Sequence, residues 1–428
     1  MESRSWARRT YCAVSDVQIS FLILLSEFTS DNVASGRAGS ARNFDLRGKG
    51  MKLIHLSDLH LGKRLNDFSL IEDQEFILRE IYSIISEEQP DIVAVAGDIY
   101  DKPVPSAEAV RLFDEFLTKV SEQTKHIFVI SGNHDSAERI AFGAHIMEKS
   151  GIHMSPVYDG KIVPTVLSDE FGSFGVYMLP FIKPVSVRRF FPDSEIESYT
   201  DAVNTAVDAM NVDFTRRNII ITHQFVTGAQ KSESEEISVG GSDNVDSSAF
   251  DGFDYVALGH IHSPQNVGSE RIRYCGTPLK YSFSEARQEK SVTVVEFREK
   301  GDMTVRTVPV EPMRDMRVLK GSFEYICSRE CSSEGNTSDY IHAVLTDEED
   351  IPEAMGRLRG VYPNIMSLEY DNRRTRSSHG SIENAEADNR LPIELFEEFY
   401  KFSNGGDMSP QQRDLAQSLI EKIWECGE

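Results

Sequence analysis

The sequence lacks a long uninterrupted run of hydrophobic residues. The longest candidate, residues 19–25, is short and is followed closely by Glu27. A helix that crosses a bilayer needs roughly 20 predominantly apolar residues. We therefore expect no membrane-spanning segment, and the hydrophobic content of 40% is instead typical of a globular core.

Cysteine is scarce and irregularly placed. The 428 residues include five cysteines, and no Cys-x-x-Cys pair occurs among them. Zinc ribbons and disulfide-stabilised scaffolds both need paired or regularly spaced cysteines, so neither is indicated. A reducing compartment, the cytoplasm, is the simplest expectation.

Positive charge is also in short supply. Lys and Arg number 45 against 69 Asp and Glu, which gives a net charge of −24. Taken alone, this balance argues against nucleic acid as a partner, because phosphate contacts need positive charge. Bound divalent metals supply local positive charge that side-chain counting misses, and a basic partner subunit could supply more.

The first fifty residues differ from the rest of the chain. They show no clear helical or strand period, and residues 34–50 are rich in Gly, Ala, Ser and Arg. A strand pattern begins at Met51, so we interpret residues 1–50 as an extension of uncertain status. A transit peptide is the alternative, but the stretch contains five acidic residues, which argues against it.

Residues 51–310 alternate between predicted strands and helices. Short apolar, β-branched runs at 92–96, 127–130, 219–222 and 255–258 have the length of buried strands. An amphipathic helix is expected over 70–88, and Ser106 is a plausible N-cap for another. The pattern predicts a layered α/β fold.

Beyond residue 310 the organisation changes. Residues 340–345, 351–361 and 365–370 indicate strand, helix and strand, so residues 311–370 are predicted to form a small α/β domain. Residues 371–390 are polar and are interpreted as a linker. Residues 391–428 become apolar and periodic again, as two short helices separated at Asn404-Gly405-Gly406.

Five short segments carry chemistry, and each directly follows a predicted strand. Ligands at strand ends converge on one edge of a sheet, where rigid strands fix their positions. The segments are Asp58-Leu59-His60, Gly97-Asp98, Gly132-Asn133-His134-Asp135, His223 and Gly259-His260-Ile261-His262.

These residue types are metal ligands. Carboxylate, imidazole and amide oxygen donors suit manganese, iron or zinc. Asp58 and His60, like His260 and His262, lie two residues apart and so on the same side of an extended segment. Each piece alone is more often an incidental turn or a structural histidine. Together, in this order and at strand ends, they predict a two-metal site for phosphoryl chemistry.

The order of the segments resembles the calcineurin-like metallophosphoesterase superfamily. Further stretches resemble the SbcD nucleases within it, and the resemblance covers roughly residues 51–370. It implies a β-sandwich flanked by helices, with a small capping domain and a helical tail. The stretches are Ser57-Asp58-Leu59-His60-Leu61-Gly62, residues 97–101, residues 222–226 and residues 274–285.

The resemblance implies two divalent metals, with manganese expected, bridged by Asp98. The other ligands it implies are Asp58, His60 and His262 for one metal, and Asn133, His223 and His260 for the second. His134 is implied to act on the scissile phosphate rather than on the metals. Asp101 would orient the His134 imidazole through its carboxylate, with an ordinary exposed loop Asp as the alternative.

The function implied is a DNA nuclease, both double-strand exonuclease and single-strand or hairpin endonuclease. It would act in DNA repair, recombination and replication with an SbcC-type ATPase, as a dimer within a heterotetramer. The alternatives are a small-molecule phosphodiesterase of the same superfamily and a scaffold on a degenerate fold. A scaffold predicts missing ligands, whereas every expected ligand is present.

Contacts to DNA and to the partner are the least specified. The basic or aromatic residues nearest the metal segments are Lys63, Arg64, Lys280 and Tyr281. The cluster of arginines at 373, 374 and 376 is more typical of a solvated linker. The apolar residues of 391–428 are expected to bind the ATPase as amphipathic helices, or else to fold back on their own chain.

Overall fold

The computed structural model describes residues 50–230, 243–373 and 375, and then residues 393, 396–397, 399–401, 406–413, 415–417 and 419. The interpretations of residues 1–50 as an extension and of 371–390 as a linker therefore fall almost wholly outside the described residues. None of the helices described has the length and apolar run that a bilayer crossing requires.

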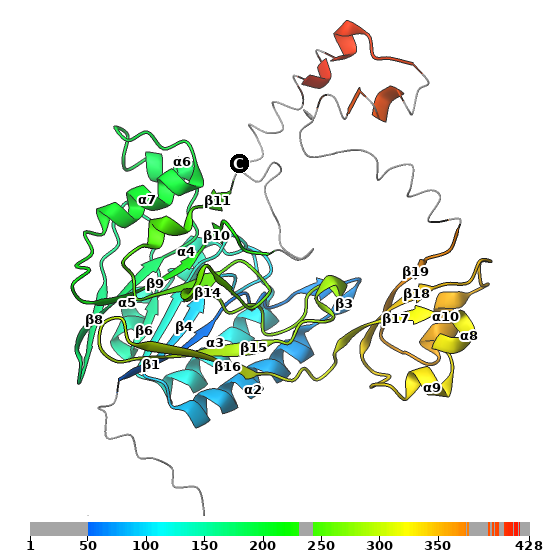
Figure 1. Ribbon diagram of the computed structural model, residues 1–428, viewed down its shortest axis with the longest axis horizontal. Coiled ribbons are helices and arrows are strands. Elements are labelled where there is room, and N and C mark those ends of the chain that lie inside the picture. Colours follow the sequence, from blue (N-terminus) through cyan, green and yellow to red (C-terminus); the bar gives the residue numbers. More distant parts are fainter. Residues whose placement is uncertain are drawn as a thin grey trace, which may run out of the picture. The chain divides into compact units, whose positions relative to one another are not determined.

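The first of two large sheets forms around the strand predicted to begin at Met51. Its strand order is β16-β15-β1-β4-β5-β6 (Figure 1). The four strands β1, β4, β5 and β6 are parallel, and β15 and β16 are antiparallel to their neighbours. Their bounds are β1 Met51–Leu56, β4 Ile92–Ala96, β5 His126–Ile130, β6 Ile152–Met154, β15 Ser291–Phe297 and β16 Met303–Pro309.

The second sheet also has six strands, in the order β13-β14-β12-β9-β8-β7. The strands β8, β9, β12 and β14 are parallel, with an antiparallel strand at each edge. The bounds are β7 Thr165–Asp169, β8 Gly172–Leu179, β9 Arg217–His223, β12 Tyr255–Gly259, β13 Gln265–Val267 and β14 Ser269–Tyr274. All seven residues of β9 are buried, as expected of a strand covered on both faces.

The two sheets pack face to face. Leu53 and Phe128 of the first sheet share one buried apolar cluster with Phe174 and Ile219 of the second. Because side chains alternate along a strand, the opposite faces of both sheets remain for helices to cover. This arrangement is the predicted β-sandwich.

Helices cover both outer faces, which confirms the layered α/β fold. On the first sheet, α2 (Ile71–Glu88) and α3 (Ala107–Ser121) contribute Ile81 and Phe113 to the cluster that contains Val93. The predicted N-cap of α3 is present, because Ser106 Oγ accepts a hydrogen bond from the Ala109 N–H at 3.2 Å. On the second sheet, α6 (Pro184–Arg188) and α7 (Tyr199–Ala209) take the equivalent place.

The remaining elements of this part are short. They are β2 Arg64–Leu65, β3 Phe68–Ser69, α4 Ala137–Ile140, α5 Ala144–Met147, η1 Glu148–Ser150, β10 Phe225–Val226, β11 Asn244–Val245, η2 Ser247–Phe250 and η3 Phe283–Glu285.

A three-stranded parallel sheet follows β16, in the order β17-β18-β19. The predicted strand, helix and strand are present, but α10 is shorter than the expected helix over 351–361. Glu353 has a φ of 54°, which stops a helix from forming before Ala354. With α8 and α9, this sheet encloses its own apolar cluster. The bounds are β17 Met316–Gly321, α8 Phe323–Ile326, α9 Arg329–Ser332, β18 Tyr340–Leu345, α10 Ala354–Arg359 and β19 Ile365–Tyr370.

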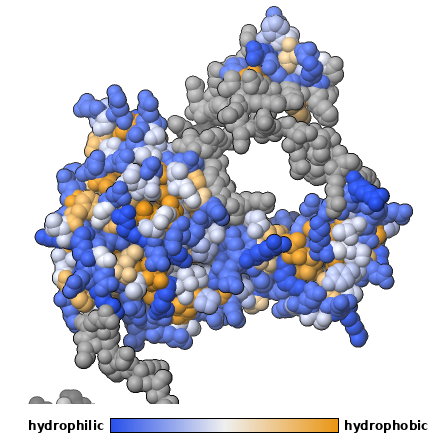
Figure 2. Space-filling view, in the orientation of Figure 1, coloured by the Kyte–Doolittle hydropathy of each residue, from blue (hydrophilic) through white to orange (hydrophobic). Residues whose placement is uncertain are grey.

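The described residues of the tail are helical on both sides of the predicted break. Gln412 Nε2 donates to Tyr400 Oη at 3.1 Å, and Arg413 lies 2.7 Å from Glu397, so the two helical segments contact each other. Phe399 remains 64% exposed. In the space-filling view of Figure 2, hydrophilic residues cover most of the visible surface and apolar residues lie between them.

Candidate metal centre

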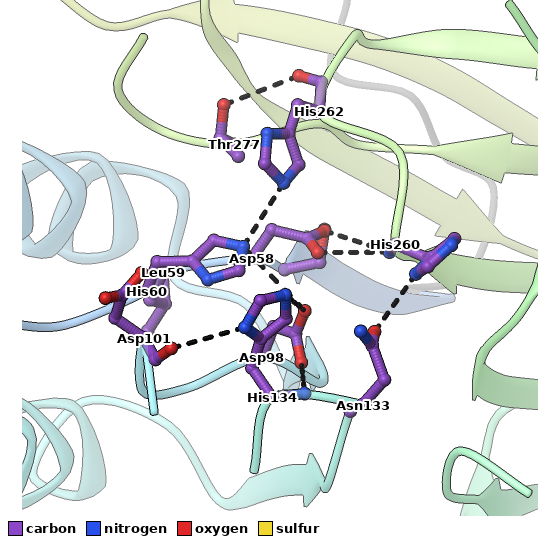
Figure 3. Close-up of polar contacts among 12 residues, drawn as sticks. Asp58, Leu59, His60, Asp98, Asp101, Asn133, His134, His260, His262 and Thr277 are labelled. Atoms are coloured by element: carbon purple, nitrogen blue, oxygen red, sulfur yellow. Dashed lines mark hydrogen bonds and ion pairs between the residues drawn. The ribbon is translucent and has the colours of Figure 1, made fainter. Parts of the chain in front are cut away.

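The five segments predicted to carry chemistry come together at one edge of the sandwich. They lie at the carboxyl ends of β1, β4 and β5 in one sheet and of β9 and β12 in the other, with His223 the last residue of β9. Figure 3 shows most of these side chains pointing toward a common centre. The residues brought together are Asp58, His60, Asp98, Asn133, His134, His223, His260 and His262.

Several of these residues have a backbone conformation that is rare for L-amino acids. The φ angles are 53° at Asp58, 44° at His60, 50° at Asp98 and 103° at His260. Such conformations cost about 1–3 kcal/mol each and persist only where the surroundings determine them. Four such residues lie at one edge of the sheets, so the surrounding structure must hold the backbone in a strained conformation there.

Glycines allow the segments to approach one another. A Cβ atom at Gly259 would lie 1.9 Å from the Ala96 carbonyl oxygen, and one at Gly132 would lie 2.1 Å from Asp98 Oδ1. Gly97 combines a φ of 87° with a distance of 2.5 Å from its hypothetical Cβ to His223 Nδ1. A side chain at Gly97 or Gly259 would push the two sheets apart at this edge, and one at Gly132 would push apart the loops after β4 and β5.

Asp98 lies at the middle of the cluster. Its Oδ2 atom is 3.3 Å from His223 Nε2 and 3.7 Å from His60 Nε2, and its Oδ1 accepts a hydrogen bond from the His134 N–H at 2.9 Å. Side-chain donors thus approach this one carboxylate from both sheets. The position is the one a carboxylate that bridges two cations would occupy.

One group of donors lies on the His60 side of Asp98. His60 Nε2 and His262 Nε2 are 3.2 Å apart, and ligand atoms of Asp58, His60 and His262 all lie within 4.8 Å of one another. The Asp58 carboxylate also accepts the His260 N–H at 3.1 Å, which links the loops after β1 and β12.

A second group lies on the His223 side. Asn133 Oδ1 is 3.0 Å from His223 Nε2 and 3.1 Å from His260 Nδ1. His223 Nδ1 donates to the Ala96 carbonyl oxygen at 2.8 Å, because a carbonyl can only accept. That bond places a proton on Nδ1 and directs Nε2, the other ring nitrogen, at the cluster.

Burial sets the protonation of these groups. It lowers the pKa of His260 to about 3 and holds that of His60 well below its usual range, so both imidazoles keep a lone pair. Burial also raises the pKa of Asp58 to about 6. At Asp98 burial acts in the same direction, but the neighbouring histidines, His223 foremost, together outweigh it and keep the pKa well below its ordinary value. Burial lowers the pKa of His223, but the Asp98 carboxylate outweighs that effect and raises it to about 9, so a cation that binds His223 Nε2 must displace a proton.

The donor set fits two divalent cations. Two carboxylates, one amide oxygen and four imidazoles converge, and ionised carboxylates are rarely buried without a compensating charge. Mixed oxygen and imidazole donors of this kind suit manganese, iron or zinc rather than a thiolate-selective metal.

His134 differs from the other histidines in its exposure. Its side chain is 16% exposed, whereas the His60 side chain is 1% exposed. His134 Nδ1 donates to the Asp101 main-chain carbonyl at 3.2 Å, and Nε2 lies 3.9 Å from Asp98 Oδ2. The imidazole is therefore oriented toward the cluster and is accessible from outside it.

Asp101 contacts His134, but the prediction that it does so through its carboxylate is wrong. The Asp101 carboxylate instead accepts a hydrogen bond from Lys63 Nζ at 2.7 Å, and only the main-chain oxygen of Asp101 reaches His134. The ammonium group beside it offers the carboxylate a stronger partner than a neutral imidazole would.

The residues considered for DNA contact have other partners. Tyr281 is 2% exposed, and its hydroxyl donates to the Leu59 carbonyl, so it is not a surface residue. Lys280 Nζ lies 2.7 Å from Asp315, and Lys63 pairs with Asp101. Arg64 donates to the nearby Asp67 carbonyl at 2.6 Å.

Two residues have supporting roles that were not predicted, although Asp135 belongs to one of the five segments. Asp135 accepts the N–H groups of Ile99, Tyr100 and Gly132, each at 3.0 Å, and so ties the loop after β4 to the loop after β5. Its place directly after His134 was the only available signal.

Gln74 has a comparable role on the first loop. Its Oε1 accepts the Gly62 N–H at 2.9 Å and its Nε2 donates to the His60 carbonyl at 2.8 Å. Gln74 lies on the buried face of the predicted helix over 70–88. A polar amide among apolar residues on that face was the feature of the sequence that could have indicated its role.

Comparison with known proteins agrees with this geometry. The calcineurin-like phosphoesterase family matches residues 51–264, and the type 5 capsule protein repressor C-terminal domain, SbcD_C, matches residues 312–404. The SbcD subunit of the SbcCD nuclease from Staphylococcus epidermidis is 33% identical over 377 residues, which cover 87% of this chain and 99% of that protein.

A solved structure, a dimetal phosphatase from Danio rerio, is 10% identical with a TM-score of 0.36, covering 62% of this chain and 99% of that one. The family assignment rests on the sequence matches. The chain belongs to the calcineurin-like phosphoesterase family and, within it, to the SbcD nuclease subunits.

Proposed function

We propose that the chain is a metal-dependent DNA nuclease that hydrolyses phosphodiester bonds at the centre around Asp98. The observation that carries the proposal is the pair of donor groups that share Asp98, in a chain of the SbcD family. We assign Asp58, His60 and His262 with Asp98 to one cation, and Asn133, His223 and His260 with Asp98 to the other.

Manganese is the proposed metal, because a mixed set of carboxylate, amide and imidazole donors suits it. When bound, the two cations supply the positive charge that a phosphodiester needs and activate the attacking water. The protein's own contribution is to hold the donors rigidly through the strand ends and the glycine contacts between the loops.

His134 is the proposed catalytic residue. Its exposed position and its Nδ1–H bond to the Asp101 carbonyl leave Nε2 directed at the centre. A protonated His134 can neutralise charge that develops on the phosphate or donate a proton to the leaving oxygen. Asp101 supports this role through its main-chain oxygen, which holds the imidazole in one orientation.

The proposed partners are DNA and an SbcC-type ATPase, with two copies of the chain in a heterotetramer. Activity on duplex ends and on hairpins would place the protein in DNA repair, recombination and replication. A small-molecule phosphodiesterase is less favoured, because the match to SbcD_C over residues 312–404 extends beyond the phosphoesterase domain.

The test is a cleavage assay with manganese on three substrates: linear duplex DNA, hairpin DNA and a cyclic nucleotide. Each is assayed with and without the ATPase partner. Cleavage of the two DNA substrates in preference to the nucleotide supports the proposal. Hydrolysis of the nucleotide alone would replace it with the small-molecule activity.

A further inference from the structure

A buried ion pair lies directly behind one of the proposed ligands and has no part in the mechanism above. Glu285, at the end of η3, has a fully buried side chain, and its Oε1 lies 3.6 Å from His262 Nδ1. Its other carboxylate oxygen lies 2.5 Å from Lys290 Nζ, whose side chain is 4% exposed.

The two nitrogens of His262 face different surroundings. Nε2 lies 3.2 Å from His60 Nε2, on the side of the metal centre, whereas Nδ1 faces Glu285. A carboxylate can only accept, so the contact favours a proton on Nδ1 and leaves the Nε2 lone pair facing the metal centre. The Nδ1 of His223 also faces an acceptor, the Ala96 carbonyl oxygen, at the shorter distance of 2.8 Å.

Lys290 completes the support from the other side. Its ammonium group donates to the His262 main-chain oxygen at 2.9 Å and to Thr277 Oγ1 at 2.8 Å. Figure 3 shows Thr277 beside the His262 carbonyl, and the Thr277 N–H donates to that oxygen at 3.1 Å. The ion pair thus holds both the ring and the backbone of His262.

We propose that Glu285 is a positioning residue, which with Lys290 fixes the orientation and tautomer of His262 for metal binding. If Glu285 and Lys290 served only to stabilise the fold, neither would need to contact His262. Carboxylates that hold metal-binding histidines are a general device, and their loss typically weakens metal affinity by about 10–100-fold. The inference rests on the proposed metal centre but not on DNA as the substrate.

The discriminating variant is Glu285→Gln, in the full chain stripped of metal and titrated calorimetrically with Mn²⁺. Lys290 would retain the amide oxygen, which turns the NH₂ group toward His262 Nδ1. That contact favours a proton on Nε2 and so blocks the ligand atom. We expect Mn²⁺ affinity at one site to fall by about 10–100-fold.

The double variant Glu285→Gln/Lys290→Met tests whether Mn²⁺ affinity recovers when Lys290 no longer orients the amide. Without the ammonium group, the amide oxygen can accept from Nδ1–H, so part of the lost affinity should return. The matched control is Asp169→Asn, which breaks another buried pair, with Arg217, at the opposite end of β9 from His223. It should lower the melting temperature without changing Mn²⁺ affinity.

The inference would be overturned if Glu285→Gln binds Mn²⁺ with an affinity within about twofold of that of the unchanged chain. The loss expected for a positioning carboxylate is much larger. If that variant does not fold, Glu285→Met/Lys290→Met replaces the pair with apolar groups of similar size, which proteins often tolerate. Unchanged Mn²⁺ binding in that variant would overturn the inference equally. A chain that passes these tests but cuts no DNA contradicts the proposed nuclease function and leaves the role of Glu285 standing.

Discussion

At the scale of single residues, His134 and His223 both lie beside Asp98 but differ in exposure. Mutation of each should therefore have a different effect. His223 is fully buried with Nε2 directed at Asp98, whereas His134 is partly exposed at the mouth of the same cluster. We propose the first as a metal ligand and the second as the group that acts on the substrate.

We therefore expect His134→Ala to retain both metals while its cleavage rate falls by about 10²–10⁴-fold, the usual contribution of a general acid or base. His223→Ala should lose metal as well as activity. Metal content measured beside cleavage distinguishes the two. A His134→Ala chain without metal would show that His134 is a ligand.

Gln74 provides a residue-scale test of the strained first loop. Gln74→Leu leaves the partly buried Gly62 N–H and the buried His60 carbonyl without this partner, and the free energy of unfolding should fall by about 1–3 kcal/mol. The control is Gln123→Leu, whose amide makes one exposed contact with Tyr82 at 3.4 Å. Denaturant unfolding measures both, and equal losses would show that the contacts of Gln74 contribute nothing.

The ligand-type residues were predictable because each directly follows a buried strand. The supporting residues were not, because their roles depend on which loops the fold brings together. Glu285 is distant in the sequence from His262, and Asp101 reaches His134 only through its main chain. Neither contact follows from residue type or spacing.

At the scale of elements, β4 and β5 could be predicted because their apolar runs are almost wholly buried. The run over 92–96 is fully buried in the structure and matches β4 residue for residue. By contrast, β16 and β17 were missed. Both have partly exposed faces, so their sequences mix polar and apolar residues and show no continuous apolar run.

The C-terminal tail supports an element-scale prediction. Phe399 and Leu415 are 64% and 60% exposed, which is apolar surface suited to a partner. A chain that ends at Arg390 should keep its metals but lose the ATPase in a pull-down. Full co-purification of that shorter chain would move the main interface onto the phosphoesterase domain.

At the scale of the whole molecule, the net charge of −24 remains the main physical objection to DNA binding. The basic residues nearest the centre are already paired, Lys63 with Asp101 and Lys290 with Glu285. We therefore expect the positive charge for the proposed DNA substrate to come largely from the proposed cations and from the proposed partner.

Residues 1–50 lie beyond the matched phosphoesterase domain, which begins at residue 51. A chain that starts at Met51 should fold and cut DNA as well as the full chain, with a melting temperature within about 2 °C, because it keeps the whole of the matched domain. Loss of soluble protein on this truncation would show that the first residues pack against the domain.

The measurement that tests the central claim most directly is the metal dependence of DNA cleavage by the full chain with its ATPase partner. Hairpin DNA is incubated with Mn²⁺, with excess chelator, and with Mn²⁺ restored, alongside Asp98→Ala, which removes the carboxylate shared by both donor groups. We predict cleavage that disappears with chelator, returns with Mn²⁺ and is absent in Asp98→Ala. Undiminished cleavage in excess chelator, or by Asp98→Ala, would contradict the account.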